Sequence, residues 1–311
     1  MPAPAPYVSN CYDPAATRPV AKVERVLIHR PEREWTYSHH PHLSALGGRL
    51  VAIWSSGRQH EDDAGQRVLL STSTDFADWS RPRPLLDTLA GRQGEAVLTA
   101  AGLYRHAGTL VAYAGRFEYQ PQALAGGRRL PGDVGHRDTG LVAVVSEDGD
   151  RWAAPRDLGL PLVPNHGPQP SRSGRLILSG NVLFPYSDDL SGLTGWRLAG
   201  IYPPDMGGRL FDDSEGFWLV RQRQGWACGL CEGSFFQTDD GLLHMMLRSG
   251  TERLWQTWSA DDGASWSAPA PSEFTDNGTK FHFGRLPDGR FYYVGCPDPE
   301  PRGARCPLVL S

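Results

Sequence analysis

Several side chains that can transfer protons are clustered in the first quarter of the sequence. His39, His40 and His42 lie almost side by side, and His60 follows in the next polar stretch, among carboxylates. An imidazole titrates near neutral pH, so it can act as a general base or a general acid. A hairpin over this region would place His40 and His60 at the same end of two adjoining strands. We therefore predict that this pair transfers protons, with Tyr113 assisting.

Arginines beside other polar residues indicate a second kind of chemistry, the binding of an anion. Glu232 and Arg248 lie at the two ends of one expected hairpin, and because its strands run antiparallel, both side chains should emerge at one end. A guanidinium pairs with a carboxylate through two parallel hydrogen bonds. We therefore expect Arg116, Arg248 and Arg305 to hold a substrate carboxylate, with His166 and Glu232 beside them.

The overall charge narrows the choice of partner. The 311 residues carry a formal net charge of −4, so a nucleic acid or an anionic membrane is not expected as the partner. Lysine occurs only at Lys22 and Lys280, so the cation of a site should be an arginine. The same bias would also follow from the base composition of a genome. No apolar run is long enough to span a membrane.

A repeated pattern indicates how these residues are positioned. Residues 73–82, 146–155 and 259–269 each contain Ser, Asp, Trp and Pro in that order, and residues 187–196 contain a looser copy. Asp accepts backbone hydrogen bonds in a tight turn, Gly takes positive φ, and the Trp can fold back as an apolar plug. Each of the three copies follows a strand-like run. The pattern is therefore typical of the recurring corner in the blades of a β-propeller.

Strand pairs with Gly-containing turns define the other blade strands. They are expected at residues 43–54, 103–113, 170–178, 235–247 and 283–294. Five blades follow, and a sixth if residues 197–220 form one. We predict a single all-β domain over residues 1–311, a β-propeller of four-stranded blades with six or seven in the ring. The 36 Gly and 26 Pro fit its many turns.

The two ends of the chain carry expectations of their own. Residues 307–311 read as a strand leading into another Asp-containing turn, so we expect either a last blade shortened at its C-terminus or an unusual closure of the ring. The N-terminal MPAPAP lacks the charged start and apolar stretch of a secretory signal. The chain as given is therefore expected to be cytoplasmic, or secreted or periplasmic if a signal was removed.

The repeated turns resemble the Asp box, or BNR repeat, of the sialidase superfamily, and residues 259–266 fit its S-x-D-x-G-x-S-W pattern at every position. The resemblance implies that Glu232 matches the Glu that assists the sialidase Tyr nucleophile. Arg248 and Arg305 would then match two of the three arginines that bind the substrate carboxylate. The N-terminal Arg segment of sialidases has no match at Arg25 or Arg30, and the histidine cluster occupies that region instead.

The first blade is more similar to the uronate-directed lyases and their related α-L-rhamnosidases, whose paired histidines resemble His40 and His60. This resemblance implies β-elimination at a uronate, such as the glucuronate of a rhamnosyl-glucuronate glycan. Two alternatives remain open: an exo-glycoside hydrolase of sialidase or rhamnosidase type, using Glu232 with Asp62 or Glu118, and a non-catalytic glycan-binding propeller. In each case the partner is an oligosaccharide or a polysaccharide.

No cofactor follows directly from the sequence. Calcium or another divalent cation near the propeller axis is an open alternative, with His39, His40, His166 and Asp62 as candidate ligands. The Cys228-x-x-Cys231 pair has no matching second pair, so these residues are expected to be thiols rather than a zinc site. The oligomeric state is left undetermined.

Overall fold

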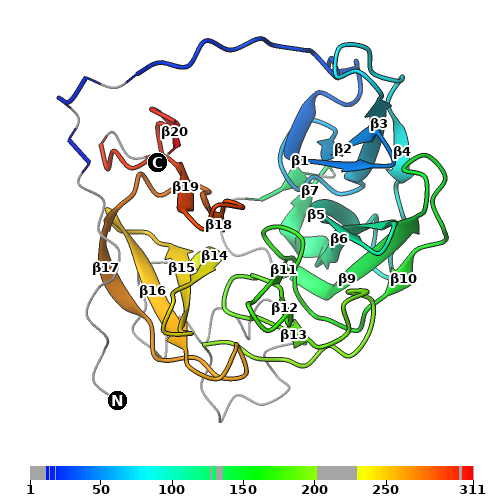
Figure 1. The fold of residues 1–311 in the computed structure, drawn as a ribbon. Coiled ribbons are helices and arrows are strands. Elements are labelled where there is room, and N and C mark those ends of the chain that lie inside the picture. The colour runs from blue at the N-terminus through cyan, green and yellow to red at the C-terminus, as the bar shows by residue number, and fades with distance from the viewer. Residues whose placement is uncertain are drawn as a thin grey trace.

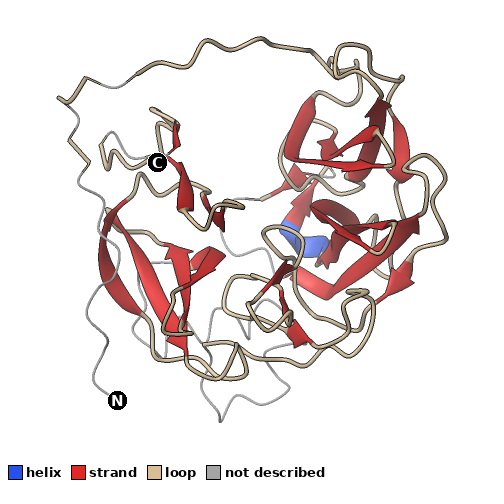
Figure 2. Ribbon diagram, viewed as in Figure 1, coloured by secondary structure: helices blue, strands red, loops and turns tan. Residues whose placement is uncertain are grey.

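The chain is almost entirely β-structure. The computed structural model describes residues 12–310 apart from residues 14, 18, 127, 131–135, 202–229 and 301–302. Within these residues the strands are accompanied by a single short 3-10 turn, Pro121–Ala123, and no α-helix (Figure 2). The predicted all-β class is confirmed. Most of the segment 197–220, a candidate sixth blade, lies outside the described residues.

Three antiparallel sheets have four strands each, which confirms the predicted four-stranded unit. The first has the order β1-β2-β3-β4, with strands Tyr37–Leu46, Arg49–Gly57, Arg67–Ser73 and Arg83–Leu86. The second has the order β10-β9-β6-β5, where β5 is Val97–His106, β6 is Thr109–Tyr119, β9 is His136–Ser146 and β10 is Arg156–Asp157. The other, with the order β14-β15-β16-β17, contains Cys231–Gln237, Leu243–Arg248, Arg253–Ser259 and Ala270–Thr275.

The remaining described strands form smaller sheets. One has β11 (Gln169–Pro170), β12 (Leu176–Ile177) and β13 (Tyr186–Ser187), and another has β18 (His282–Arg285), β19 (Phe291–Gly295) and β20 (Val309–Leu310). A two-stranded ribbon pairs β7 (Leu124–Ala125) with β8 (Arg128–Arg129). Each of the five predicted hairpins is present, because its Gly-containing turn and alternating strands are local features of the sequence.

The sheets follow one another around a ring (Figure 1). The N-terminal segment, residues 19–36, crosses the interval between the sheet of β18–β20 and the sheet of β1–β4. Within it the His29 ring packs against Trp54 with ring centroids 5.4 Å apart, and before it the Tyr12 hydroxyl donates a hydrogen bond to Asp298 Oδ2 at 3.3 Å. The extended N-terminus thus connects the last described sheet to the first.

The repeated Asp-containing turns have the predicted construction. In the third copy the buried Ser259 hydroxyl accepts the Gly263 N–H at 2.8 Å, and the Trp266 indole N–H donates to Gly263 O at 3.1 Å. The Trp79 indole makes the same bond to the carbonyl of Phe76 at 3.0 Å. In the looser copy Trp196 donates to Gly192 O at 3.2 Å. The looser copy is therefore built in the same way.

The hydrophobic core lies between successive sheets. The largest cluster joins the sheet of β5–β10, the sheet of β11–β13 and the sheet of β14–β17. It includes Val111, Tyr113, Leu178, Phe184, Leu243 and Met245. A second cluster joins the first two sheets, with Ile53, Leu70, Leu98 and Leu110, and a third joins the last two, with Phe236, Phe274, Phe283 and Tyr293. Face-to-face packing therefore holds each of these sheets against the next. No described helix is long and apolar enough to cross a membrane.

Candidate functional site

Polar side chains converge at the end of the ring opposite the Asp-containing turns. In each sheet the innermost strand begins at this end and its hairpin partner finishes there, because the two are antiparallel. His39 and His40 lie at the start of β1, Glu232 at the start of β14, and Arg248 at the end of β15. The topology therefore brings residues far apart in sequence to one end of the molecule.

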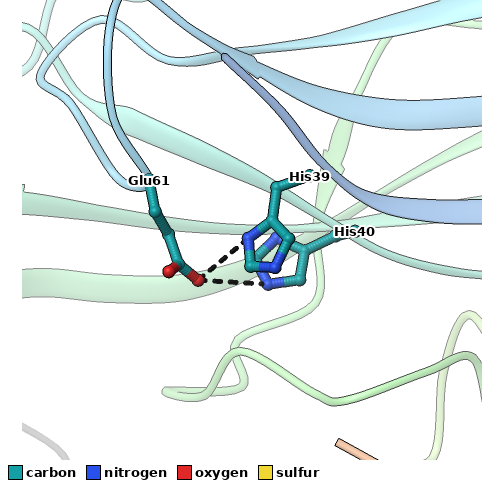
Figure 3. A group of neighbouring side chains, drawn as sticks. All are labelled: His39, His40 and Glu61. Atoms are coloured by element: carbon teal, nitrogen blue, oxygen red, sulfur yellow. Dashed lines mark ion pairs between the residues drawn. The ribbon is translucent and has the colours of Figure 1, made fainter. Parts of the chain in front are cut away.

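His39, His40 and Glu61 form a close cluster of ionisable groups (Figure 3). One carboxylate oxygen, Glu61 Oε1, lies 2.9 Å from His39 Nδ1 and 3.7 Å from His40 Nε2. The two imidazole rings are stacked at a tilt, with their centroids 3.7 Å apart. The histidine side chains are largely buried, whereas that of Glu61 is 44% exposed. One side of the cluster is thus open to a ligand.

A β-bulge aims these side chains. His40 and Pro41 on β1 lie opposite the single residue Trp54 on β2, and His40 has φ = +50°. The same bulge occurs on β14, where Glu232 and Gly233 lie opposite Leu247 and Glu232 has φ = +47°. A bulge redirects a side chain out of the strand alternation. It therefore accounts for the placement of both His40 and Glu232.

Burial lowers the proton affinity of the His40 imidazole. Burial, followed by the charge of Lys280, lowers the pKa of His40 to about 3. The His40 ring is also held from behind, with Nδ1 3.3 Å from the buried Ser55 hydroxyl. Contact with the His39 ring is the main cause that lowers the pKa of Glu61, and His40 and Arg305 add to it against the effect of burial. At neutral pH the cluster is a carboxylate beside a neutral His40 ring.

Glu232 and Arg248 form an ion pair at the same end, as predicted. Arg248 Nη1 donates to Glu232 Oε2 at 2.6 Å, and both side chains are about three-quarters buried, at 30% and 25% exposure. The Glu232 backbone N–H donates to Asn181 Oδ1 at 3.2 Å. The pair is therefore positioned by main-chain as well as side-chain contacts.

Two further cations link this pair to the histidine cluster. Burial lowers the pKa of Lys280, and the charges of Glu232 and Glu61 partly offset that effect. Lys280 thus lies within electrostatic range of both carboxylates. The charge of Arg305 similarly helps to lower the pKa of Glu61, while the Arg305 backbone N–H donates to Asn277 Oδ1 at 3.3 Å. We treat these groups as one axial site, comprising His39, His40, Glu61, Glu232, Arg248, Lys280 and Arg305.

Three other histidines, His42, His166 and His282, lie within electrostatic range of Lys280. The rings of His166 and His282 meet edge to face at 5.0 Å, and His282 Nδ1 lies 3.4 Å from the Ser234 hydroxyl. Burial is the main cause that lowers the pKa of His166 to about 3 and that of His42 to about 4. His166 therefore belongs to a group of imidazoles that are neutral at neutral pH.

Some predicted site residues are placed elsewhere. His60 is exposed in the loop between β2 and β3, and the next residue, Glu61, is the one that contacts His40. Tyr113 is fully buried in the core, and its hydroxyl donates to Gly192 O at 3.0 Å. It lies in the middle of β6 rather than at the strand end that the sequence indicates. Proton transfer by Tyr113 therefore has no geometric support.

Arg116 lies near the end of β6, an odd number of residues from Tyr113, so the two side chains face opposite sides of the sheet. Its guanidinium donates to the buried Glu118 carboxylate at 3.2 Å. With Asp138 and Asp157 it lines a separate cavity of about 290 Å³ at the rim of the second sheet. It is therefore not one of the groups in the axial site.

Sequence reasoning missed Glu61 and Lys280. Glu61 is adjacent to His60, and only the course of the loop decides which of the two faces the axis. Lys280 could have been noticed because lysine is rare here: it is one of two lysines in an arginine-rich chain. The sequence predicts arginine for the cations of the site, whereas the group assigned here includes Lys280. Of the proposed cation ligands, His39 and His40 are brought together, whereas Asp62 Oδ1 lies 3.4 Å from both Gln66 Nε2 and Thr99 Oγ1.

Known structures share this fold. A protein of unknown function from Dyadobacter fermentans is 18% identical, with 88% of this chain and 78% of that one aligned at a TM-score of 0.58. The intramolecular trans-sialidase of Ruminococcus gnavus is 16% identical over 88% of this chain and 80% of that one, with a TM-score of 0.57. For the NanB sialidase of Streptococcus pneumoniae the identity is 14%, the coverage 92% and 60%, and the TM-score 0.61.

Sequence comparison gives the family. No curated protein sequence matches the chain at a significant level. The family model described as a BNR repeat-like domain matches residues 48–311, which include all three of the clear Asp-containing turns. Together with the sialidase-type β-propeller fold of its structural neighbours, this match means that the chain belongs to the BNR repeat-like domain family.

Proposed function

We propose that the protein is a carbohydrate-active enzyme that binds a terminal acidic sugar in the axial site and hydrolyses its glycosidic bond. One observation carries the proposal: the largely buried ion pair of Arg248 with Glu232 lies at the same end of the molecule as Glu61, and the charges of Lys280 and Arg305 act on these carboxylates. In this proposal the cations bind the carboxylate of the sugar. The carboxylates take part in hydrolysis of its glycosidic bond.

The binding step uses the cations. A sugar carboxylate entering the site would exchange hydration for charge-assisted hydrogen bonds from the guanidinium groups. Arg248 is already held in place by Glu232, so little of its conformational freedom is lost on binding. Among the similar structures, the Ruminococcus gnavus trans-sialidase was solved with a carboxylate ligand, oseltamivir carboxylate. That precedent supports an acidic sugar for this site.

The hydrolytic step uses the carboxylates. Glycoside hydrolysis commonly requires two carboxyl groups that flank the bond, one to protonate the leaving oxygen and one to act on the other face of the sugar. Glu61 comes from the first sheet and Glu232 from the sheet of β14–β17, so they approach a sugar on the axis from different sheets. The sialidase resemblance of Glu232 and Arg248 supports this assignment.

A second reaction, β-elimination at a uronate, is favoured by one specific contact. A base that removes a proton from carbon requires an orienting partner, and His40 lies between Glu61 and the Ser55 hydroxyl. In this alternative His40 would remove the C5 proton of the uronate while the cations neutralise its carboxylate. The electron pair would form the C4–C5 double bond as the C4–O4 bond breaks, and the proton taken up by His40 would pass to the departing O4 of the sugar or chain.

The test is a substrate panel of sialyl, rhamnosyl-glucuronate and ulvan oligosaccharides. Release of a saturated acidic sugar supports hydrolysis, and an ultraviolet-absorbing unsaturated uronate supports elimination. Binding of an acidic sugar without any product would instead identify a glycan-binding module and overturn the enzymatic proposal. No binding of any acidic sugar would overturn the assignment of the axial site.

Arg248→Met gives the corresponding residue-level prediction. Loss of a charge-assisted hydrogen bond costs about 1.5–3 kcal/mol, so we expect roughly 10-fold to 100-fold weaker binding of the acidic sugar. Calorimetric titration with the sugar measures the change. Arg285→Met is the matched control, because Arg285 is an exposed guanidinium at the other end of its sheet. Equal affinity of the two variants would contradict the role of Arg248.

A further inference from the structure

We propose that His39, His40 and Glu61 form a binding site for a divalent transition metal ion of the zinc class. Each of the three residues offers one ligand atom, and these atoms all lie within 4.8 Å of one another. Glu61 Oε1 is close to both His39 Nδ1 and His40 Nε2. This proposal concerns metal binding by the chain itself. It can be tested by metal binding alone, without a sugar substrate.

The separations between the ligand atoms suit such an ion. Zinc bonds of about 2.0–2.1 Å in a tetrahedral arrangement place neighbouring ligand atoms about 3.3–3.4 Å apart. The observed distances from Glu61 Oε1, 2.9 Å to His39 Nδ1 and 3.7 Å to His40 Nε2, lie on either side of this value. Small rotations of the side chains would therefore bring all three atoms into a zinc coordination sphere.

The backbone is arranged to bring the two histidines together. Adjacent residues of a β-strand normally face opposite sides of the sheet. Here the bulge and the φ of +50° at His40 place both rings on the same side, against the same carboxylate oxygen. A left-handed conformation at a residue other than glycine costs of order 1–3 kcal/mol, and such strain is typical of functional sites.

The donor set selects the class of ion. Two imidazole nitrogens and one carboxylate oxygen suit zinc and related first-row ions, whereas calcium requires six to eight oxygen ligands. Three protein ligands leave one tetrahedral position for water or a substrate oxygen. The side chain of Glu61 is 44% exposed, which leaves room for such an open position. The calcium alternative suggested by the sequence is therefore less well matched than zinc.

The second layer of contacts supports the same assignment. Metal-bound histidines usually donate their other ring N–H to a fixed acceptor. His40 Nδ1 lies 3.3 Å from Ser55 Oγ, which also accepts the Ala100 backbone N–H at 2.9 Å. With the Nδ1 proton directed to Ser55, the lone pair of His40 Nε2 faces Glu61. His39 Nδ1 is itself buried and has no hydrogen-bond partner of good geometry among the described residues.

The charge of Lys280 opposes metal binding. It acts on both His40 and Glu61, so a divalent ion at the cluster would be repelled by it. This gives the proposal an unusual signature: Lys280→Met should bind the metal more tightly than the native chain. A site built from residues elsewhere would not respond in this way.

The experiment is calorimetric titration of the full chain with zinc chloride after removal of metal with a chelator. We expect one ion per chain at this site, and we expect His39→Ala and Glu61→Gln each to abolish it. Ser55→Ala should weaken binding about 10-fold to 100-fold. The matched control is His60→Ala, which removes the exposed imidazole adjacent to Glu61 and should leave zinc affinity unchanged.

Cobalt(II) provides a second measurement. Bound in place of zinc, it should give the visible absorption of a tetrahedral ion, and this absorption should be lost in Glu61→Gln. Circular dichroism of each metal-free variant establishes that it is folded. Unchanged zinc binding in folded His39→Ala and Glu61→Gln would assign the ion to other groups, such as the Cys231 thiol, and overturn the proposal. Absence of stoichiometric binding to the native chain would overturn it as well.

Discussion

Residues of the axial site adopt backbone conformations that side chains rarely take. His40, Glu232 and Arg305 have φ values of +50°, +47° and +55°. Each conformation costs of order 1–3 kcal/mol relative to an extended residue. The surrounding sheets must supply that energy, since none of these residues is glycine. The fold is therefore less stable than it would be with relaxed residues at these three positions.

His166 provides a prediction at this scale. Its folded-state pKa of about 3 lies below the ordinary value of 6.5. As the pH falls below about 6.5 the unfolded chain takes up a proton and the folded chain does not, so the free energy of unfolding decreases until about pH 3. One such group contributes at most about 1.4 kcal/mol per pH unit. The groups that act on it, His282, Lys280 and His42, all disfavour its protonation, and the Gly167 carbonyl favours it.

Urea unfolding at pH 7 and pH 5 measures this effect. We expect the native chain to lose more stability between these two values than His166→Gln does. His60→Gln serves as the control, because His60 is exposed. Equal losses in the native chain and in His166→Gln would contradict the assignment of a buried neutral imidazole.

At the scale of single elements, the Asp-containing turns depend on a buried serine. Ser259 is 1% exposed, and its hydroxyl accepts the Gly263 N–H at 2.8 Å. Ser259→Ala would leave that buried donor without a partner, at a cost of about 1–3 kcal/mol in the free energy of unfolding. Ser265 donates to Asp261 from the exposed side of the same turn. Ser265→Ala should therefore change stability by no more than about 0.5 kcal/mol.

Chemical denaturation of the two serine variants tests this difference. The residue type, the substitution and the turn are the same in both, so the difference lies in the burial of the hydroxyl and in the backbone N–H groups that it accepts. A similar loss of stability in both variants would mean that the turn does not depend on the buried hydroxyl. The same comparison can be repeated at Ser146, which is also buried and accepts the Gly149 N–H at 2.8 Å.

Elements of this kind were predictable from sequence because their signals are local. The hairpins and the Asp-containing turns need only neighbouring residues, and the positions of Glu232 and Arg248 follow from one hairpin. The choice between His60 and Glu61 does not follow in this way. Their loop is fixed by the Asp63 carboxylate, which accepts the backbone N–H groups of Gln59 and His60 at 2.7 Å each.

The error at Tyr113 has a different cause. The strand β6 continues to Tyr119 rather than ending near Tyr113, so an aromatic residue expected at the rim lies in the middle of the strand. The length of a strand is decided by its pairing with β9, which a single sequence does not reveal. The bulge at His40 is equally hidden, because nothing in the residues His40 and Pro41 specifies that they lie opposite one partner.

At the scale of the whole molecule, the close approach of neighbouring sheets limits substitution. Gly102 on β5 has φ = +125°, and a Cβ atom there would lie 1.8 Å from the backbone nitrogen of Gly167. That distance cannot be relieved by rotating a side chain, since the obstructing atoms are backbone. Gly102→Ala must therefore push β5 away from the segment around Gly167, which leads into β11.

We expect Gly102→Ala to destabilise the fold by about 3 kcal/mol or more, because it disrupts packing in addition to imposing backbone strain. Gly108→Ala is the matched control: Gly108 also has positive φ, +81°, but a Cβ atom there would meet nothing within 4 Å. Its cost should be about 1–2 kcal/mol. Thermal unfolding of both variants measures the difference, and equal losses would contradict the close approach of the sheets.

The two matching bulges at the start of β1 and β14 place side chains of the site at positions that do not take part in the strand pairing. His40 and Glu232 fall outside the residue-by-residue pairing of their sheets, whose registers resume at His42 and Ser234. The pairing of the strands is therefore indifferent to which side chain occupies either position. A substitution at either position can therefore change the reactive group of the site while the strand register of the sheet stays the same.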